Sequence, residues 1–546
     1  MNVINNLAKG DFESIWITSY FATFSRFIGG ANLTKMDLTI PEFFRDRHIF
    51  ITGGTGFMGK VLIEKLVRSC HSISKIYLLV RRKKDKAPEE RLKELTDQPI
   101  FERVKKEQPG ALERILVPVL GDVTEKSLGL TQKDEDMLTS NVSVIFHVAA
   151  SVRFDDPIKD AVLMNTRGTR EVVYLAKKIP QLKVLLHVST TYCNCILPEV
   201  DEKVYPMPID WREAIDVVER LDPASLNILS NKYLDSYPNT YTFTKNLAEQ
   251  VILEHKDHLP VIIFRPSIVI STYKEPMPGW IDNFNGPVGL LVGIGKGVIR
   301  TTMGSNTAVP DYMPVDVAIK AMIVAAWLTG TQRDKPSTVP VYNSSTMSKS
   351  ISSGELNDLG MKAVMKYPFL KVLWYPGVLV TESEACFYGN VFIKHLLPGI
   401  LIDTYLRLKG QTPILLKLYR RYYLAIVALQ YFTTKSWKFY NKNFLGLLSK
   451  IHPLDFEDFD FNFEDVEPTE YFENAVIGGH TYLLRSDLYS FLPEARKNIR
   501  KMFWLDRTVK VVSASVVIWY LCSETSFNLM MGLLKRIVNI FFPLNS

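Results

Sequence analysis

A strand, a glycine-rich turn and a helix follow one another without interruption near the start of this chain. The apolar run at 48–52 leads directly into Gly53, Gly56 and Gly59, and the helical pattern KVLIEKLVRS follows. In this order the first glycine permits a tight turn, the second lets the backbone approach a pyrophosphate, and the third allows close helix packing. The amides at the start of the helix then face the phosphates. The predicted cofactor contacts of this dinucleotide-binding unit are Gly53, Thr55, Gly56, Phe57, Met58 and Gly59.

Apolar strand patterns alternate with helical patterns over the rest of the first half. Further strands are predicted at 75–80, 115–120, 142–148 and 183–188, with helical segments between them. This alternation predicts an α/β fold with a Rossmann-like, doubly wound parallel sheet. Ligands of such a sheet lie at the carboxyl ends of its strands, where small residues leave room for a cofactor. Two of these strands are followed by predicted cofactor contacts: Asp122, Val123, Ala149 and Ala150.

Four cations follow the second predicted strand, in the order Arg81, Arg82, Lys83 and Lys84. An NAD site normally places an acidic residue near this point, where it binds the ribose 2′-hydroxyl. Guanidinium groups fit the geometry of a phosphate, so the pattern favours NADPH, with Arg81 or Arg82 on the 2′-phosphate. A solvated charged loop is the alternative interpretation.

Tyr241 and Lys245 lie four residues apart in a predicted helix, so they share one face of it. A cationic lysine beside a phenol stabilises the phenolate, which lets the tyrosine give a proton to a carbonyl oxygen or take one back. The predicted strand at 183–188 ends in Ser189 and Thr190, and a hydroxyl from either one can hold that oxygen.

Length and composition exclude several classes of protein. A chain of 546 residues, 47% hydrophobic and 23% charged, is globular and long enough for two or three domains. Its net charge of +7 is spread along the chain, without the basic blocks that nucleic-acid binding requires. The five cysteines are unpatterned, and Cys193-x-Cys195 lacks the second pair that a metal site needs. We therefore expect neither nucleic acid nor metal, and a reduced, cytosol-facing environment.

Four segments outside the predicted sheet are apolar enough to suggest membrane contact. The segment 15–28 has no cleavage signal and is either an amphipathic surface helix or a helix packed on the protein itself. The segments 391–408 and 414–432 are broken by charges, so neither is a clean span of about 20 residues. Each is expected to enter the lipid interface, to line an acyl-chain tunnel, or to form ordinary core. Short apolar runs within 509–542 predict a membrane-inserted hairpin or a tilted anchor.

Six motifs occur in one order along the chain: TGGTGFMG, GDVT, HVAASVRFD, NTRGT, HVSTTYCN and YTFTK. With the G-x-x-G-x-x-G spacing of the first, they resemble the extended short-chain dehydrogenases. HVAASVRFD, FRPSIV and PGWIDNFNGP are similar to fatty acyl-CoA reductases in particular. The similarity continues through DYMPVD and, less specifically, through KGQTP and Ser436-Trp437. Met58 stands where the family usually has leucine, a swap that conserves volume.

The resemblance implies a division of the chain into four parts. Residues 1–40 form an N-terminal extension, and 41–350 form an NADPH-binding reductase domain. Residues 351–475 form a mainly helical C-terminal domain. Residues 476–546 form a membrane-associated tail, with the anchor at about 509–542.

The resemblance also implies the reaction, in which NADPH reduces a long-chain fatty acyl-CoA to a primary alcohol in two hydride transfers through an aldehyde. It makes Tyr241 the proton donor and Lys245 its partner, which also holds the nicotinamide ribose. Thr190 is the expected hydroxyl on the substrate oxygen, and Ser189 is the alternative. The further cofactor contacts that it implies are Asn165, Pro266, Ile268 and Val269.

Other functions share parts of this pattern. A reductase that stops at the aldehyde, or another membrane-associated short-chain enzyme such as a hydroxysteroid dehydrogenase, would keep every cofactor motif. The long C-terminal region argues against the steroid enzyme. A non-catalytic membrane scaffold would not need the tyrosine and lysine. The expected location is the surface of the endoplasmic reticulum or of peroxisomes, with the catalytic domain facing the cytosol, in wax or ether lipid biosynthesis. A homo-oligomer is left open.

Overall fold

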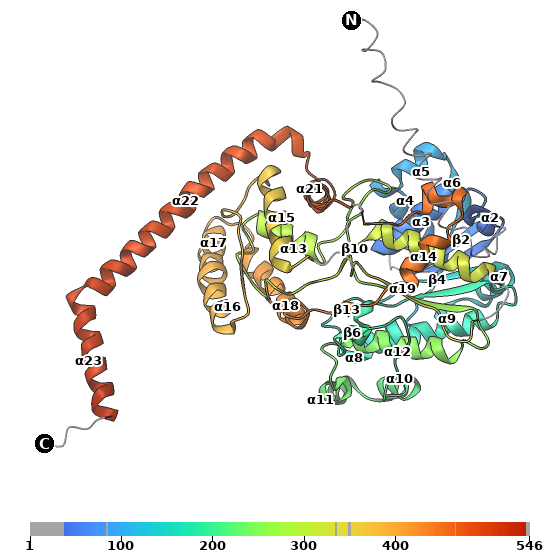
Figure 1. Cartoon of the computed structure of the whole chain (residues 1–546), viewed down its shortest axis with the longest axis horizontal. Coiled ribbons are helices and arrows are strands. Elements are labelled where there is room, and N and C mark those ends of the chain that lie inside the picture. The colour runs from blue at the N-terminus through green and yellow to red at the C-terminus, as the bar shows by residue number, and fades with distance from the viewer. Residues whose placement is uncertain (1–37, 83–85, 333–335, 348–350, 465, 542–546) are drawn as a thin grey trace, which may run out of the picture. The chain divides into compact units, whose positions relative to one another are not determined.

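The structure is a computed structural model that describes residues 38–82, 86–332, 336–347, 351–464 and 466–541 (Figure 1). The predicted helix at 15–28 and the cations Lys83 and Lys84 lie outside these residues. Contacts divide the chain into residues 1–39 and residues 40–546, and the second unit holds the whole predicted sheet.

Seven parallel strands form the central sheet, in the spatial order β11-β7-β5-β4-β1-β2-β3. They are β1 (His48–Thr52), β2 (Lys75–Val80), β3 (Leu116–Leu120), β4 (Val142–His147), β5 (Val184–Val188), β7 (Val261–Pro266) and β11 (Val341–Ser344). Strand β1 pairs with β2 on one side and with β4 on the other, so the strand order reverses there. This confirms the predicted Rossmann-like, doubly wound fold and places the glycine turn at the switch point.

Four helices of the reductase half pack in two pairs, α3 with α14 and α9 with α12. Their bounds are α3 (Phe57–Ser69), α9 (Gly168–Lys177), α12 (Thr240–Glu254) and α14 (Val315–Thr331). Helix α14 is apolar on nearly every side and almost wholly buried, as a helix within a core must be. Further helices of this half are α2 (Ile40–Phe44), α4 (Pro88–Thr96), α5 (Glu102–Glu107), α6 (Ala111–Ile115), α7 (Gln132–Asn141), α8 (Ile158–Ala161), α10 (Trp211–Arg220) and α11 (Pro223–Leu234).

The C-terminal half is mainly helical, as predicted. Its main helices are α15 (Ser353–Lys366), α16 (Glu384–Val391), α17 (Leu397–Leu408), α18 (Leu415–Thr433), α21 (Pro468–Gly478), α22 (Leu488–Cys522) and α23 (Glu524–Phe541). Helix α13 (Pro287–Gly295) of the reductase half packs against α15 and α21. Strand β12 (Leu379–Thr381) pairs with β9 (Thr301–Met303), and β13 (Lys438–Phe439) pairs with β6 (Glu199–Val200). These two pairs join the C-terminal half to the reductase half by backbone hydrogen bonds.

Several helices of the C-terminal half carry exposed apolar side chains. Within the described ranges, one helical stretch, Glu384–Leu408, is long and apolar enough to cross a membrane. The sequence pattern from 391 onwards predicts no clean span; the structure differs because the helix begins earlier, at Glu384, and runs for 25 residues. Exposed apolar residues also cover the last part of α22 and much of α23, including Val511, Val516, Trp519 and Leu529.

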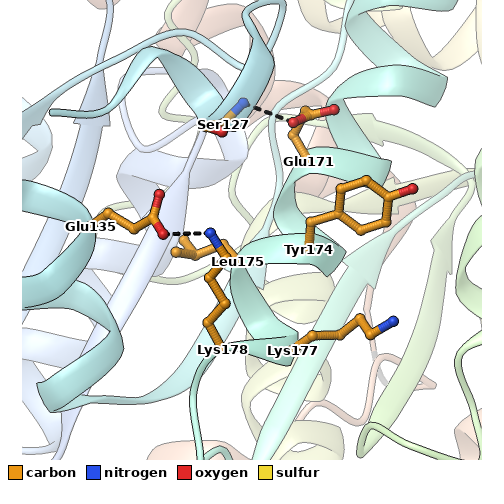
Figure 2. Close-up of a pocket in the computed structure, with 7 residues that line it drawn as sticks. All are labelled: Ser127, Glu135, Glu171, Tyr174, Leu175, Lys177 and Lys178. Carbon is orange, nitrogen blue, oxygen red and sulfur yellow. Dashed lines mark hydrogen bonds and ion pairs between the residues drawn. The ribbon is translucent and has the colours of Figure 1, made fainter. Parts of the chain in front are cut away.

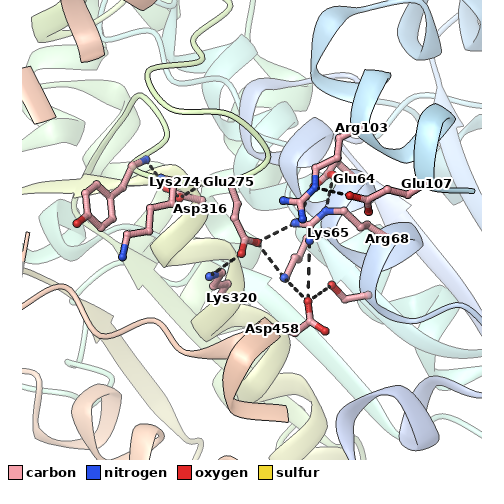
Figure 3. A network of polar contacts seen from close by, with 12 residues as sticks. Glu64, Lys65, Arg68, Arg103, Glu107, Lys274, Glu275, Asp316, Lys320 and Asp458 are labelled. Carbon is pink, nitrogen blue, oxygen red and sulfur yellow. Dashed lines mark hydrogen bonds and ion pairs between the residues drawn. The ribbon is translucent and has the colours of Figure 1, made fainter. Parts of the chain in front are cut away.

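A buried ion network holds α3 against segments that are distant in sequence (Figure 3). Glu275, in the loop after β8 (Ile268–Ile270), lies 2.9 Å from Lys65, 2.7 Å from Arg68 and 3.2 Å from Lys320. Asp458 of α20 (Phe456–Phe459) lies 3.3 Å from Lys65. Burial raises the pKa of Glu275, but the three cations outweigh it and lower that pKa to about 2. Charge as well as apolar packing therefore holds the helix that follows the glycine turn.

Candidate active site

The turn after β1 has the tight geometry that its glycines predict. Gly53 has a φ of 76°, and a Cβ there would lie 2.6 Å from the Ala149 backbone nitrogen. A Cβ on Gly59 would lie 2.3 Å from the Gly53 oxygen, so a side chain would push α3 away from the turn. Gly56 is the N-cap of α3, and no side chain in the described part of the chain caps this helix start. The first amides of α3 are therefore open to an anion such as a pyrophosphate.

The loops after β2 and β3 lie side by side, because Val80 pairs with Leu120 at the ends of these strands. Arg81 Nε consequently lies 3.3 Å from Asp122 Oδ2, with the Arg81 side chain 54% exposed. Asp122 also accepts hydrogen bonds from the backbone nitrogen and the Oγ1 of Thr124, both at 2.9 Å. The sequence predicts Asp122 as a cofactor contact but does not indicate its pairing with Arg81. The order of neighbouring parallel strands is the signal that would have indicated it.

Helix α12 brings Tyr241 to the hydroxyl groups that follow β5. Burial raises the pKa of Tyr241, and a hydrogen bond with the Thr190 side chain lowers it in part. Thr190 Oγ1 also accepts a hydrogen bond from the Tyr192 backbone nitrogen at 3.2 Å. Ser189 instead lies near the Cys193 thiol. Of the two hydroxyls, the structure places Thr190 next to the phenol.

Lys245 follows Tyr241 by one turn of α12, and it is 2% exposed. Its Nζ donates a hydrogen bond of 2.6 Å to the Val188 carbonyl at the end of β5. Burial lowers the pKa of Lys245 to about 8, although Glu249 and Cys193 act in the opposite direction. The ammonium group thus lies at the carboxyl end of β5, where parallel sheets bind their ligands.

A fully buried ion pair lies next to Lys245. Arg265 of β7 donates to the two carboxylate oxygens of Glu249 at 2.7 and 2.6 Å, and both side chains are 0% exposed. Cys193 Sγ donates to the same carboxylate at 3.2 Å. The pair connects α12 to β7 and places a negative charge one turn from Lys245. The spacing of Lys245 and Glu249 is visible in the sequence, but nothing there indicates Arg265 as the partner.

Asn165 joins the loop after β4 to α12. Its Oδ1 accepts a hydrogen bond from the Ser151 backbone nitrogen at 2.9 Å, and its Nδ2 donates to Ser151 O at 3.1 Å and Thr244 Oγ1 at 2.9 Å. Protein groups therefore engage its whole amide, and a direct contact with the cofactor stays a prediction. The other predicted contacts lie at strand ends, at the start of β8 or around the start of α3: Thr55, Phe57, Met58, Arg82, Val123, Ala149, Ala150, Pro266, Ile268 and Val269.

Two histidines lie in neighbouring strands of the core. His147 Nδ1 lies 2.7 Å from Thr52 Oγ1 and its Nε2 lies 3.0 Å from Thr169 Oγ1, so both ring nitrogens have partners. Burial lowers the pKa of His147 to about 3, which keeps the ring neutral. By contrast, neither ring nitrogen of His187 has a hydrogen-bond partner among the described residues.

Two surface hollows lie away from the glycine turn. One, of about 330 Å³, lies beside α7 and α9 (Figure 2), where Lys178 pairs with Glu135 at 2.5 Å. It is lined by Ser127, Glu135, Glu171, Tyr174, Leu175, Lys177 and Lys178. It contains none of the predicted site residues. The other, of about 340 Å³, includes Asp311, Ser436, Trp437 and Lys438 in its lining.

The fold and this site define a nicotinamide-dependent reductase of the short-chain dehydrogenase type. The glycine turn lies at the switch point of the sheet, and the Tyr241–Lys245 helix lies beside the end of β5. A solved structure with a similar fold is the terminal reductase domain of the myxalamid biosynthetic pathway, with a TM-score of 0.53. It is 19% identical and covers 81% of this chain and 93% of its own.

Sequence comparisons narrow the class to one family. A family model described as Male sterility protein matches residues 51–322, and a second one with this description matches residues 394–486. Fatty acyl-CoA reductase 1 of Xenopus laevis is 38% identical, over 85% of this chain and 90% of its own. Fatty acyl-CoA reductase 2 of Mus musculus is 37% identical, over 85% of this chain and 89% of its own. The chain belongs to the fatty acyl-CoA reductase family, which confirms the predicted resemblance.

Proposed function

We propose that this protein reduces a long-chain fatty acyl-CoA to the primary alcohol and coenzyme A, with NADPH as the cofactor. The observation that carries the proposal is the pairing of Tyr241 with Thr190 at the end of β5, one helical turn from the buried Lys245. The substrate is supported by relatives named fatty acyl-CoA reductase, which align over most of the chain.

The residues of the glycine turn fit a dinucleotide. Side chains at Gly53 and Gly59 would clash with the backbone that shapes the turn, and the start of α3 has no side-chain cap in the described part of the chain. Arg81 and Arg82 are the candidates to hold the 2′-phosphate of NADPH, and Asp122 orients the guanidinium of Arg81. When bound, the nicotinamide supplies the hydride.

The protein's own contribution is to stabilise charge on the substrate oxygen. Burial keeps the Tyr241 phenol protonated, so it can donate a proton to the thioester carbonyl as negative charge develops there. Thr190 holds the same oxygen, and Lys245, charged below about pH 8, stabilises the phenolate that remains. The hemithioacetal then releases coenzyme A as its thiol, and the same three residues act on the aldehyde in the second reduction.

An enzyme bound to a membrane, with its catalytic domain facing the cytosol, would explain the exposed apolar residues of the C-terminal helices. The helical stretch Glu384–Leu408 and the exposed apolar residues of α22 and α23 favour association with lipid. Every cysteine is a free thiol, which fits a reducing compartment. The proposed location is the cytosolic face of the endoplasmic reticulum or of peroxisomes.

The test is cofactor oxidation by the full-length protein in detergent micelles, with palmitoyl-CoA as substrate and NADPH compared with NADH. We expect two NADPH consumed for each coenzyme A released, and hexadecanol as the product in gas chromatography. Tyr241→Phe should lower kcat by roughly 10²–10⁴-fold, while NADPH binding, followed by its fluorescence, persists. Hexadecanal as the final product would limit the function to the first reduction. Full turnover by Tyr241→Phe would remove that residue from its role.

A further inference from the structure

An aromatic cluster connects Tyr241 to the C-terminal half of the chain. Phe154, in the loop after β4, stacks on Tyr241 with ring centroids 5.7 Å apart and 24° between the ring planes. The same ring contacts Phe432, in the last turn of α18, at 5.3 Å. Phe432 also contacts Tyr192, which follows β5, at 5.6 Å. Phe154 therefore bridges the proposed proton donor and a residue nearly 200 positions further along the chain.

The segment that carries Phe432 is attached to the reductase half by hydrogen bonds. Thr433 Oγ1 donates to the Met303 carbonyl at 3.0 Å, and Trp437 Nε1 donates to the Cys195 carbonyl at 2.9 Å. The Trp437 ring packs against Phe432 with centroids 5.7 Å apart. The pairing of β13 with β6 continues this attachment. The Phe432 ring is consequently held beside the active site.

Three of the four rings are not wholly buried. Tyr192 is buried, whereas Phe154, Tyr241 and Phe432 each remain partly exposed. Ile268, a predicted cofactor contact, packs with Phe432 against the buried residues around Tyr192. An apolar and partly open wall thus lies next to both the proton donor and the expected position of the nicotinamide.

We propose that Phe154 and Phe432 form the subsite for the first methylene groups of the acyl chain. This inference rests on the proposed function, because it requires the thioester carbonyl to reach the Tyr241 hydroxyl. An acyl chain attached to that carbonyl is then within reach of a ring that stacks on Tyr241. Contact with aromatic rings removes methylene groups from water, which lowers the free energy of the complex. A polar group in the same place would not be stabilised in this way. The C-terminal half therefore completes the substrate site.

The test measures binding of S-octyl-coenzyme A, a thioether that cannot be reduced, to the full-length protein in detergent micelles by isothermal titration calorimetry. Phe432→Ala should raise the Kd of this thioether about tenfold. S-ethyl-coenzyme A lacks the methylene groups in question, so its Kd should change by less than about twofold.

Tyr431→Leu is the matched control. The Tyr431 ring also contacts Phe432 and Trp437, and its hydroxyl binds the Cys195 carbonyl at 3.1 Å. The substitution thus loosens the same segment but leaves the rings of Phe154 and Phe432 in place. Equal weakening by Tyr431→Leu and Phe432→Ala would overturn the proposal, because both would then act through the attachment of the segment.

An unchanged Kd for S-octyl-coenzyme A in a folded Phe432→Ala variant would also overturn the subsite. If that variant does not fold, Phe432→Leu and Phe154→Leu keep much of the apolar volume, and each should raise the Kd of S-octyl-coenzyme A about threefold. An unchanged Kd in both leucine variants would overturn the proposed subsite as well. Binding that depends on Phe432 without reduction of palmitoyl-CoA would refute the proposed function alone. Reduction without that dependence would refute the subsite alone.

Discussion

Replacing Glu275 with glutamine tests how the helix after the glycine turn is held. The carboxylate lies 2.9 Å from Lys65, 2.7 Å from Arg68 and 3.2 Å from Lys320, and the Glu275 side chain is 19% exposed. Glutamine keeps the shape of the side chain and removes its charge. Lys65 then keeps Asp458 as a carboxylate partner, at 3.3 Å, but the three cations lose the group that they share.

The size of the effect follows from the pKa of this carboxyl. The three cations, working against burial, lower it from 4.5 to about 2. At about 1.4 kcal/mol for each pKa unit, this corresponds to roughly 3 kcal/mol in favour of the folded state. Burial lowers the pKa of Lys65, which offsets part of the gain. We therefore expect Glu275→Gln to lower the free energy of unfolding by about 2–3 kcal/mol at neutral pH.

The pH dependence gives this prediction a sign. The folded-state pKa lies below the unfolded one, so the stabilisation is complete above about pH 4.5 and is lost as the pH falls towards about 2. The difference between the wild type and Glu275→Gln should therefore be largest near pH 7 and shrink below about pH 4.5.

Urea-induced unfolding of the full-length protein, followed by near-ultraviolet circular dichroism, measures the difference. Glu107→Gln is the matched control, because Glu107 forms an exposed pair with Arg103 at 2.8 Å on α5 (Figure 3). The control should lower the free energy of unfolding by less than about 0.5 kcal/mol. Equal urea midpoints for the two variants would refute the view that the buried network holds α3.

Three further experiments test the cofactor preference, the role of Lys245 beside the proton donor, and the membrane contact of the C-terminal region. Alanine at both Arg81 and Arg82 should raise the Kd for NADPH at least about tenfold and leave that for NADH nearly unchanged in fluorescence titrations; equal losses would leave the arginines a structural role only. The kcat for palmitoyl-CoA should fall as the pH rises through about 8, where Lys245 loses its charge, and a flat profile would exclude this role. Truncation after Leu505 should move part of the protein from the membrane fraction to the supernatant, although Glu384–Leu408 remains; full retention would assign membrane contact to the earlier helices.

Five of the seven strands of the sheet could be predicted, because each of the five is a short apolar run between helical segments. The strands β1, β2, β4 and β5 begin and end within a residue or two of the predicted ranges. The glycine turn could be predicted too, since a side chain at Gly53 or Gly59 would clash with backbone atoms. Both features depend on residues that are close together in the sequence, and a sequence motif records such residues.

The burial of the charged face of α3 could not be predicted from the local sequence. Glu64, Lys65 and Arg68 have the composition of a solvated helix face, yet each is 5% exposed or less. Glu275 and Asp458 contact this face of the helix. In sequence, these two residues lie 210 and 393 positions from Lys65. Neither partner has a neighbourhood that indicates a buried ion network. The proposed catalytic pair could be predicted for the opposite reason, because Tyr241 and Lys245 lie on one helix.

The same limit applies to the boundary near residue 350. The first family model ends at residue 322 and the second begins at residue 394, which is compatible with separate domains. In the structure, however, Asn441 Nδ2 donates to the Ser345 carbonyl and Tyr471 donates to the Ser271 carbonyl, both at 2.8 Å. A chain that ended near 350 would leave such buried acceptors unpaired, at about 1–3 kcal/mol each, and would also leave β6 without its partner strand. The reductase half therefore depends on the C-terminal half for its stability, and the substrate subsite that we propose would extend this dependence to catalysis.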